Sequence, residues 1–421
     1  MRVLHVVKTA DGAAWAAKQA AVVASLGVEV HVAVPRLDGR CIGYWQRSGA
    51  VLHEVDLDLP ANAPWQWPAV RNRIRDIVSD VSPDIIHSHF VGSTIALRCA
   101  LGRNHPVPRV YQVAGPLHLE HALYRKLEIG SAGSSDCWIA SSRSIKDHYL
   151  RAGVDRARVF LSYYGDDLNR AHDAGSITVR DLACAAPTDR VVGSISWMYP
   201  PKPYLGQHIG LKAHELMIEA LGIAMRADRR ILGVFAGGAW GGADWYEQRL
   251  RKRGEAAGGN RFRFLGALPY ETAHEAWRGF DLAIHTPVSE NCGGVIEPLL
   301  AGVPVIASCV GGLPEVIHNN QTGWLVPARD PLALADKIVQ VLKEPLNGKE
   351  LAMRGNALVR HMFDVNRTGR EVLEIYRRVL GESEMPLEEF DARNYLDSLE
   401  SASHGEPARV RARMESSCYW K

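Results

Sequence analysis

The feature that most constrains the fold is an alternation of short apolar runs with longer amphipathic stretches, which occurs twice along the 421 residues. The first half starts with the run MRVLHVV, continues with an Ala-rich segment that stops at Gly27, and returns to the run VEVHVAVP. The second half repeats this rhythm with RVVGSIS, ILGVFAGG, DLAIHTP and VPVIAS. Strands that alternate with helices form a parallel sheet covered by helices on both faces. The sequence therefore predicts an α/β protein with two parallel sheets in tandem.

The boundary between the two sheets is predicted near residues 170–188, where small and polar residues mix without a period. We expect an N-terminal Rossmann-like domain at 1–180 and a C-terminal Rossmann-like domain at 185–365, followed by a return helix at 366–380. Residues 381–421 are charged and poor in apolar side chains, with no sustained period. Such a composition cannot bury enough apolar surface to order a chain, so we expect a mobile tail there.

Charge and cysteine usage exclude several classes of partner. The net charge is +2, with 49 basic and 47 acidic residues, which argues against nucleic acid because phosphate contacts need a basic excess. No apolar run approaches the roughly 18 residues of a spanning helix, so no membrane is expected. The N-terminus is expected to be a first strand and no signal peptide. Seven cysteines stand singly, which is typical of reduced thiols in a cytoplasm. The sequence leaves the oligomeric state unknown.

The stretch SENCGGVIEPLLAGVPVI at residues 289–306 places polar residues directly after the strand-like run DLAIHTP. Ligands of open parallel sheets bind in such loops, outside the carboxyl ends of the strands. Gly293 and Gly294 permit close approach of a ligand to the backbone, and the following helix start suits a phosphate. Glu297 can accept hydrogen bonds from the hydroxyls of a ribose, and Glu290 precedes the glycines. The alternative reading is a helix-start acid at Glu297 and a solvated loop acid at Glu290.

A second glycine pair, Gly311–Gly312, follows the run VPVIAS, and Pro314–Glu315 then opens another helix before the segment TGWLVP. Together with the stretch above, this run resembles the C-terminal signature of the retaining GT-B glycosyltransferases of family 4. The similarity extends to about residue 380. It includes the segments PDIIHSHF, KAHELMIEA, FAGG and RFLGALPYE. The resemblance implies a GT-B fold, in which two Rossmann-like domains face a cleft.

The resemblance also implies roles for individual residues. Glu297 would bind the nucleotide ribose, and Glu290 would contact the transferred sugar or support catalysis. The donor's diphosphate would lie against the backbone of Gly293 and Gly294 and against Lys212. A lysine suits this role as a compact cation.

Three departures from the family pattern are visible. Ala213 follows Lys212 where the family has glycine. Six residues separate Glu290 from Glu297 where the family has seven, so Ser289 stands at the strict spacing. The family's diphosphate-binding arginine is missing from GSISWMYPP, where Trp197 or Met198 takes its region. Lys202 is the candidate for replacing the lost charge.

The N-terminal half offers residues for the acceptor side. Gly12 follows the first strand and permits tight approach to the donor, the alternative being an ordinary turn. The segment YQVAGPLHLEH resembles the family segment that carries a catalytic-site histidine, so His118 would orient a hydroxyl of the donor sugar or the transferred group. A packing role is the alternative for His118. His87 and His89 point to the same side of a strand, but no third metal ligand is evident, so no metal and no cofactor are predicted.

Three segments, SENCGGVIEPLLAGVPVIAS, YQVAGPLHLEH and MYPPKPYLGQHIGLKAHE, resemble the glycosyltransferases of aminoglycoside antibiotic pathways. The resemblance implies transfer of N-acetylglucosamine from UDP-GlcNAc to 2-deoxystreptamine, with retained anomeric configuration. The partners would be a UDP-sugar donor and a small aminocyclitol acceptor. Another UDP-sugar, such as UDP-glucose, or another acceptor remains an alternative. A nucleotide-sugar epimerase of the same fold is a second one, whereas a dinucleotide oxidoreductase lacks its GxGxxG after the first strand.

Overall fold

The computed structural model describes residues 1–60, 63–168 and 176–404. Contacts between Cα atoms divide the chain into two compact units. Unit 1 consists of Met1–Asn169 and Met362–Phe390, and unit 2 consists of Arg170–His361 and the segment that starts at Asp391. Each unit contains one parallel sheet, so the prediction of two α/β sheets in tandem is confirmed.

The sheet of unit 1 has seven strands in the order β3-β2-β1-β4-β5-β6-β7, and all described pairs are parallel. The order reverses between β1 and β4, which lie side by side at its centre. The strands are β1 (Arg2–Val6), β2 (Glu29–Val34), β3 (Val51–Glu54), β4 (Ile85–Ser88), β5 (Arg109–Val113), β6 (Asp136–Ala140) and β7 (Val159–Leu161).

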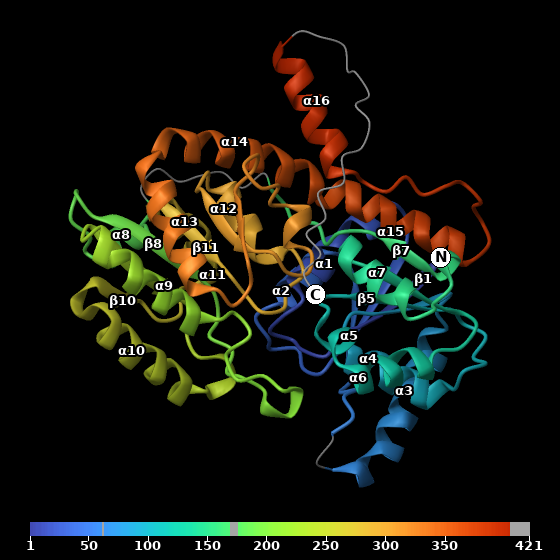
Figure 1. Cartoon of the computed structure of the whole chain (residues 1–421). Helices are drawn as coiled ribbons and strands as arrows, with labels where there is room; N and C mark the ends of the chain where they lie inside the picture. Colours follow the sequence, from blue (N-terminus) through green and yellow to red (C-terminus); the bar gives the residue numbers. More distant parts are fainter. Residues whose placement is uncertain (61–62, 169–175, 405–421) are drawn as a thin grey trace. The chain divides into compact units, whose positions relative to one another are not determined.

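Helices connect these strands and cover the sheet (Figure 1). They are α1 (Ala14–Ser25), α2 (Ile42–Arg47), α3 (Trp67–Val81), α4 (Val91–Leu101), α5 (Leu117–Glu120), α6 (Ala122–Ser131) and α7 (Arg143–Arg151). The helix α15 (Val365–Val379) returns to unit 1 from the far end of the sequence and packs on α1. A Cβ on Gly369 of α15 would come within 2.6 Å of the Cβ of Val22, so the two helices approach closely because this residue has no side chain.

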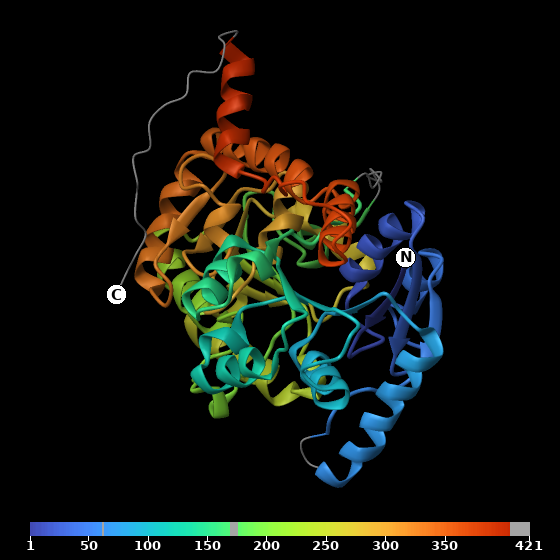
Figure 2. The same cartoon turned by 90° about the vertical axis from the view of Figure 1, so that its right-hand side faces the viewer.

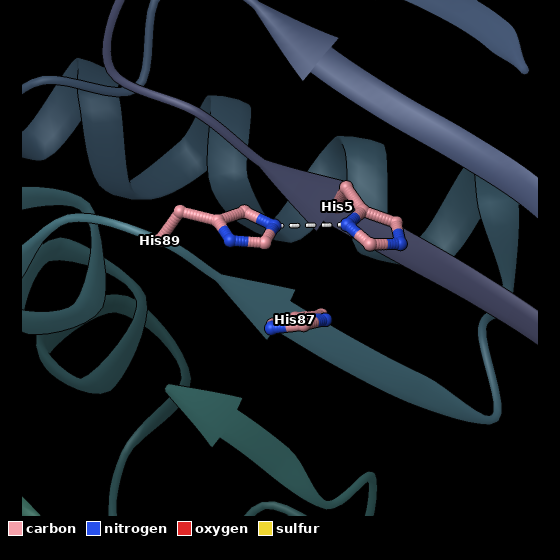
Figure 3. A group of neighbouring side chains, drawn as sticks. All are labelled: His5, His87 and His89. Atoms are coloured by element: carbon pink, nitrogen blue, oxygen red, sulfur yellow. Dashed lines mark hydrogen bonds between the residues drawn. The ribbon is translucent and has the colours of Figure 1, made fainter. Parts of the chain in front are cut away.

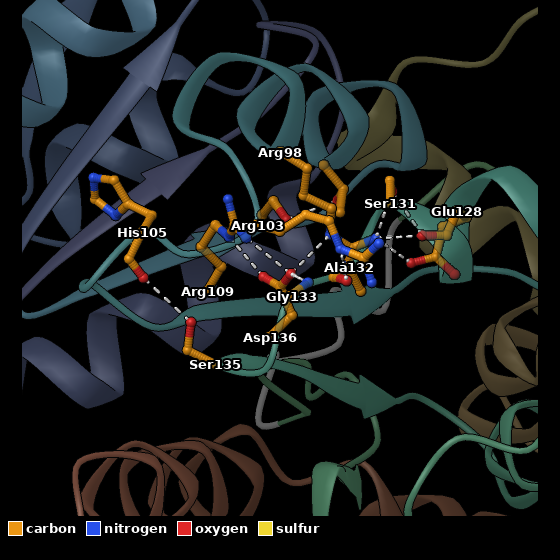
Figure 4. Close-up of polar contacts among 12 residues, drawn as sticks. Arg98, Arg103, His105, Arg109, Glu128, Ser131, Ala132, Gly133, Ser135 and Asp136 are labelled. Atoms are coloured by element: carbon orange, nitrogen blue, oxygen red, sulfur yellow. Dashed lines mark hydrogen bonds and ion pairs between the residues drawn. The ribbon is translucent and has the colours of Figure 1, made fainter.

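A buried charge network ties α4, α6 and the strands β5 and β6 together (Figure 4). Arg98 donates to the Glu128 carboxylate at 2.7 Å, and the Trp138 indole donates to the same carboxylate at 2.9 Å. Arg109 holds Asp136 through two bonds of 2.6 and 2.9 Å. The acidic side chains are fully buried, so their loss would leave buried arginines without a counter-charge.

The sheet of unit 2 has six strands in the order β10-β9-β8-β11-β12-β13, again parallel in all described pairs. The strands are β8 (Arg190–Ile195), β9 (Ile231–Ala236), β10 (Phe262–Phe264), β11 (Leu282–His285), β12 (Val305–Ser308) and β13 (Trp324–Val326). The helices are α8 (Val179–Leu182), α9 (His214–Ala227), α10 (Asp244–Gly258), α11 (Tyr270–Ala276), α12 (Ile296–Leu300), α13 (Pro331–Lys343) and α14 (Pro345–Met362). The core lies between the sheet and α9, α10 and α13.

The segment predicted as a mobile tail contains a helix that the sequence analysis missed, α16 (Ala392–His404). It extends away from the C-terminal part of α14 in both views (Figures 1 and 2). The Tyr395 ring stacks on His361 with centroids 4.6 Å apart, and its hydroxyl donates to the carbonyl of Ala357 at 3.3 Å. Residues 405–421 lie outside the described residues. Among those described, no helix combines the length and apolar character that crossing a membrane requires.

Candidate functional site

The predicted donor-site residues gather where the strand order of unit 2 reverses. The neighbours β8 and β11 mark this point, since β9 and β10 continue to one side and β12 and β13 to the other. Side chains and backbone at the carboxyl ends of such a pair form the usual ligand crevice of an open α/β sheet. Residues 196–213 follow β8, and residues 286–295 follow β11. The two loops are joined, because Val288 N–H donates to the carbonyl of Leu211 at 3.1 Å.

The second glycine pair supports the loop that carries Glu290. Gly311 has φ +52°, and a Cβ there would lie 1.8 Å from the Glu290 carbonyl oxygen. Gly312 N–H donates to the same oxygen at 3.4 Å. Only glycine tolerates both this backbone conformation and this contact, so Gly311 acts by holding the loop after β11.

Glu290 and Lys212 form a nearly buried ion pair, with side chains 13% and 16% exposed. The Glu290 carboxylate also contacts His285 Nε2 at 3.1 Å and accepts from Asn291 N–H at 3.1 Å. Burial raises the pKa of the Glu290 carboxyl, but Lys212 and His285 lower it more, so this pKa lies well below its usual range. The structure thus brings together two of the predicted residues, with the acid charged. Ser289, at the family's strict spacing, is buried.

Gly293 and Gly294 have different surroundings. A Cβ on Gly294 would lie 2.0 Å from His285 Nε2, whereas a Cβ on Gly293 would meet nothing within 4 Å. Gly294 is therefore required by the packing of His285, and Gly293 is the one whose backbone is open to a ligand. The sequence predicts ligand contacts at both glycines, and no motif in it points to His285.

The helix predicted after Gly293 and Gly294 is short. A 3₁₀ turn, η7 (Gly293–Val295), leads into α12, which has five residues. A five-residue helix sums few peptide dipoles, so it supplies less than the about half charge of a full helix end. The helix dipole at this loop is therefore weaker than the sequence predicted.

Glu297 lies in the first turn of α12, where its Oε2 accepts a hydrogen bond of 3.1 Å from the Trp277 indole. Trp277 is 1% exposed, so this bond fixes the direction of the carboxylate from the core side. The other oxygen, Oε1, has no hydrogen-bond partner within the described residues. No motif signalled Trp277, which lies 20 residues earlier in the chain.

Aromatic residues occupy the place of the missing arginine. Met198 is fully buried, and its backbone pairs with Gly238 and Trp240 in the loop after β9. Trp197 and Tyr199 both pack on Trp240, with ring centroids 5.6 and 5.1 Å apart, and Trp240 is 40% exposed. These two loops thus present an aromatic cluster in place of a cation.

Lys202 takes part in this loop through its backbone, since its N–H donates to Gln207 Oε1 at 3.2 Å. Its ammonium forms no ion pair within the described residues. Ala213, which replaces the family's glycine, has φ 53° and ψ 41° and is fully buried. This left-handed conformation costs an alanine about 1–2 kcal/mol, which explains why glycine is favoured after the lysine.

The two predicted residues of unit 1 follow strands, Gly12 in a loop and His118 in a short helix. Gly12 follows β1, and its neighbour Asp11 forms an ion pair with Arg36 and accepts from Arg40 N–H at 3.1 Å. His118 lies in α5 and is 8% exposed, with Nε2 3.4 Å from the Tyr149 hydroxyl. Burial lowers the pKa of His118 to about 4, so its ring is neutral at pH 7.

Two family models match the chain in succession. Residues 15–170 match "Glycosyltransferase Family 4", and residues 203–358 match "Glycosyl transferases group 1". Over 313 residues the chain is 28% identical to the D-inositol 3-phosphate glycosyltransferase of Saccharomonospora viridis, a match that covers 70% of each chain.

Solved structures share the fold. The Anabaena protein HepE in complex with UDP and glucose has a TM-score of 0.73 at 20% identity and covers 90% of this chain and 100% of that one. The sucrose-phosphate synthase of Thermosynechococcus elongatus has a TM-score of 0.69 at 19% identity and covers 91% of this chain and 100% of that one.

Two Rossmann-like parallel-sheet domains in tandem define the GT-B class of fold. The structures of HepE and of the sucrose-phosphate synthase match this arrangement over at least 90% of the chain. The two family models together span most of the chain, and the group 1 model includes Lys212, Glu290, Gly293 and Glu297. The chain is a glycosyltransferase of the hexosyltransferase kind, and its two halves match the family 4 and group 1 models.

Proposed function

We propose that this enzyme transfers N-acetylglucosamine from UDP-GlcNAc to 2-deoxystreptamine with retained anomeric configuration, as a step of aminoglycoside antibiotic biosynthesis. The observation that carries the donor half of this proposal is the nearly buried ion pair between Lys212, which follows β8, and Glu290, which follows β11 in the same loop as the open backbone of Gly293. An ammonium group and backbone N–H groups at a strand switch point suit a diphosphate.

The chemistry follows from where charge develops. As the bond between the sugar and the diphosphate breaks, the leaving oxygen gains negative charge, and Lys212 and the open backbone at Gly293 stabilise it. The pKa of Glu290 lies well below its usual range, so its carboxylate is ionised and its ion pair holds Lys212 in place before the donor arrives. The acceptor hydroxyl attacks from the face that the diphosphate leaves, and its proton passes to a phosphate oxygen of the leaving group.

Glu297 would grip the ribose of the donor. Its Oε2 is held by Trp277, so Oε1 can accept from a ribose hydroxyl without a change of rotamer. In unit 1, His118 would orient a hydroxyl of the transferred sugar through its neutral ring, and Gly12 would allow the donor to approach the backbone after β1. A neutral imidazole suits this positioning, since one nitrogen can donate and the other accept.

The acceptor half rests on the resemblance of three segments to aminoglycoside enzymes and on the chemistry of a relative's acceptor. D-inositol 3-phosphate, which appears in the name of the Saccharomonospora enzyme, is a cyclitol that carries a phosphate. 2-Deoxystreptamine is a cyclitol ring of similar size that carries two amines instead.

The direct test is product formation with defined substrates. The untagged enzyme is incubated with UDP-GlcNAc or UDP-glucose, each with 2-deoxystreptamine, with D-inositol 3-phosphate, or with no acceptor. We expect UDP release and a pseudodisaccharide only with UDP-GlcNAc and 2-deoxystreptamine, and an α linkage in its NMR spectrum. If a product forms only with UDP-glucose as donor, the alternative donor is supported. If a product forms only with D-inositol 3-phosphate as acceptor, the alternative acceptor is supported. A changed sugar without any acceptor would support the epimerase.

The donor site is tested separately by two variants with matched controls. Lys212→Met should lower kcat by about 10²–10³-fold, because one charge-stabilising group is lost in the transition state. The exposed Lys252 on α10 serves as control, and Lys252→Met should leave kcat unchanged.

Glu297→Gln should raise the donor KM by about 10–100-fold, the value of one hydrogen bond to a charged group. The control Glu219→Gln, on the exposed face of α9, should leave the donor KM unchanged. Unchanged kinetics in both site variants would remove the proposed donor site.

A further inference from the structure

Three histidines meet at the point where the strand order of unit 1 reverses (Figure 3). His5 on β1 and His87 on β4 are register partners on adjacent parallel strands, and their side chains therefore share one face of the sheet. His89 follows two residues after His87 and returns to the same face. The sequence displayed only His87 and His89 as a pair, whereas the sheet supplies the third imidazole from a strand more than 80 residues away.

The nitrogen atoms of this histidine cluster are close together and incompletely paired. One nitrogen from each of His5, His87 and His89 lies within 4.8 Å of the other two. His5 Nδ1 lies 2.9 Å from His89 Nε2, and His87 Nδ1 lies 2.5 Å from the Tyr376 hydroxyl on α15. The remaining nitrogens, His5 Nε2, His87 Nε2 and His89 Nδ1, are buried and have no hydrogen-bond partner in the described part of the chain. Buried polar atoms without partners are rare in folded proteins.

The surroundings bury the cluster and keep it uncharged. The three side chains are at most 2% exposed, and Trp45 and Trp15 pack against His5 and His89 with ring centroids 5.5 Å apart. Burial lowers the pKa of His5 to about 3 and keeps the pKa values of His87 and His89 well below their usual range. Neutral imidazole is the form that binds metals, so no proton competes for these nitrogens near neutral pH.

We propose that His5, His87 and His89 form a binding site for a divalent transition-metal ion of the zinc class, which joins β1 to β4 beneath the carboxyl edge of the unit 1 sheet. Imidazole nitrogens suit Zn²⁺ and its first-row neighbours. Three such ligands leave the fourth position of a tetrahedral ion to a water molecule. The site goes beyond the transfer reaction and requires no contact of the metal with substrate.

An ion between His5 and His89 would replace the contact of His5 Nδ1 with His89 Nε2. Two nitrogens bound to one tetrahedral Zn²⁺ at about 2.0–2.1 Å lie about 3.3–3.4 Å apart. The 2.9 Å separation of His5 Nδ1 and His89 Nε2 therefore has to open by only a few tenths of an ångström. Tyr376 already holds the outer nitrogen of His87, which is the kind of contact that fixes the tautomer and orientation of a metal-bound histidine.

The chain contains a matched control for this site. His31 and His53 also place an Nδ1 and an Nε2 2.9 Å apart on adjacent strands, with rings nearly parallel, and Glu29 contacts His31 at 2.9 Å. No third histidine joins them in the described residues. If a pair of histidines were sufficient to bind the ion, the pair at His31 and His53 would bind it too.

The test uses the untagged, full-length enzyme, freed of metal with a chelator and titrated with Co²⁺, whose visible absorption reports coordination. We expect one ion per chain and four-coordinate absorption in the native protein and in His53→Gln. The variants His5→Gln and His89→Gln should lose at least 100-fold in Co²⁺ affinity. Tyr376→Phe should lose about 10–100-fold, because it removes only the outer contact of His87.

Folding of the variants is checked by circular dichroism, and a second measurement needs no variant. X-ray absorption at the zinc edge of native protein loaded with Zn²⁺ should give three imidazole ligands at about 2.0–2.1 Å. Binding that survives in His5→Gln and His89→Gln, binding lost in His53→Gln, or a spectrum with fewer than three imidazoles would each overturn the site.

Discussion

The buried charge network of unit 1 allows one prediction to be worked out in detail. In Glu128→Gln the side chain keeps its shape and one acceptor oxygen but loses its negative charge. The Glu128 carboxylate is fully buried, Arg98 is 2% exposed, and their atoms lie 2.7 Å apart. Asp136 lies 3.5 Å from Arg98 Nε but already forms two bonds with Arg109, so it cannot compensate fully (Figure 4).

Breaking a buried ion pair by removing one partner costs about 3–5 kcal/mol, because the other charge remains buried. The retained amide oxygen can still accept from Trp138 or Arg98, so we expect the lower end, about 3 kcal/mol. For a unit of roughly 200 residues this corresponds to a fall in Tm of about 6–12 °C. Urea unfolding of the variant, followed by circular dichroism, measures the loss.

Glu29→Gln is the control, because Glu29 also pairs with an arginine, Arg2, at 3.0 Å. These two side chains are 51% and 39% exposed, and water screens their attraction. The pKa of Glu29 is lowered to about 2 by Arg2 and His31, yet we expect no measurable shift in the urea midpoint. An equal loss in both variants, or none in Glu128→Gln, would show that burial does not set the energy of these pairs.

Three further outcomes are expected at the donor site. Gly294→Ala should destabilise unit 2 by about 1–3 kcal/mol in a urea melt, because the added Cβ overlaps His285. Gly293→Ala should leave the stability unchanged and weaken UDP binding, as measured by calorimetry. The reverse pattern would contradict the assignment of Gly293 as the open glycine. Trp277→Phe should raise the donor KM more than it lowers kcat, since it frees the Glu297 carboxylate, and equal effects on both would argue against this positioning. Burial lowers the folded-state pKa of His214 to about 3, below the about 6.5 of the unfolded chain. The contribution of His214 to the free energy of unfolding is therefore complete above pH 6.5 and falls by about 2 kcal/mol between pH 6.5 and 5. His214→Gln should flatten this pH dependence in urea melts at both pH values.

Much of the candidate donor site could be predicted from local patterns. Lys212, Glu290 and Gly293 lie in segments that directly follow strands, and Glu297 lies in the first turn of the helix after them. The structure places these segments at the edge where the order of the unit 2 sheet reverses. The partners of these residues could not be predicted in the same way. His285 and Trp277 belong to no spacing pattern, and their contacts depend on how α12 packs over the sheet.

Helix ends were the least predictable local feature. The run VIEPLLAG has helical composition, yet only five residues of it are α-helical, with a 3₁₀ turn before them. The helix α16 was missed because its charged sequence carries few apolar residues, and its first turns are stabilised by contacts of Tyr395 with α14. Both outcomes depend on neighbours that periodicity does not encode.

The sequence by itself determined the class of fold and the loops that carry the donor-site residues, because strand length, helix period and glycine position are properties of short segments. Only the tertiary structure decided which strands are neighbours. It placed His5 beside His87 and His89, and Glu128 beside Arg98, because register between parallel strands and packing between helices join residues that lie tens of positions apart.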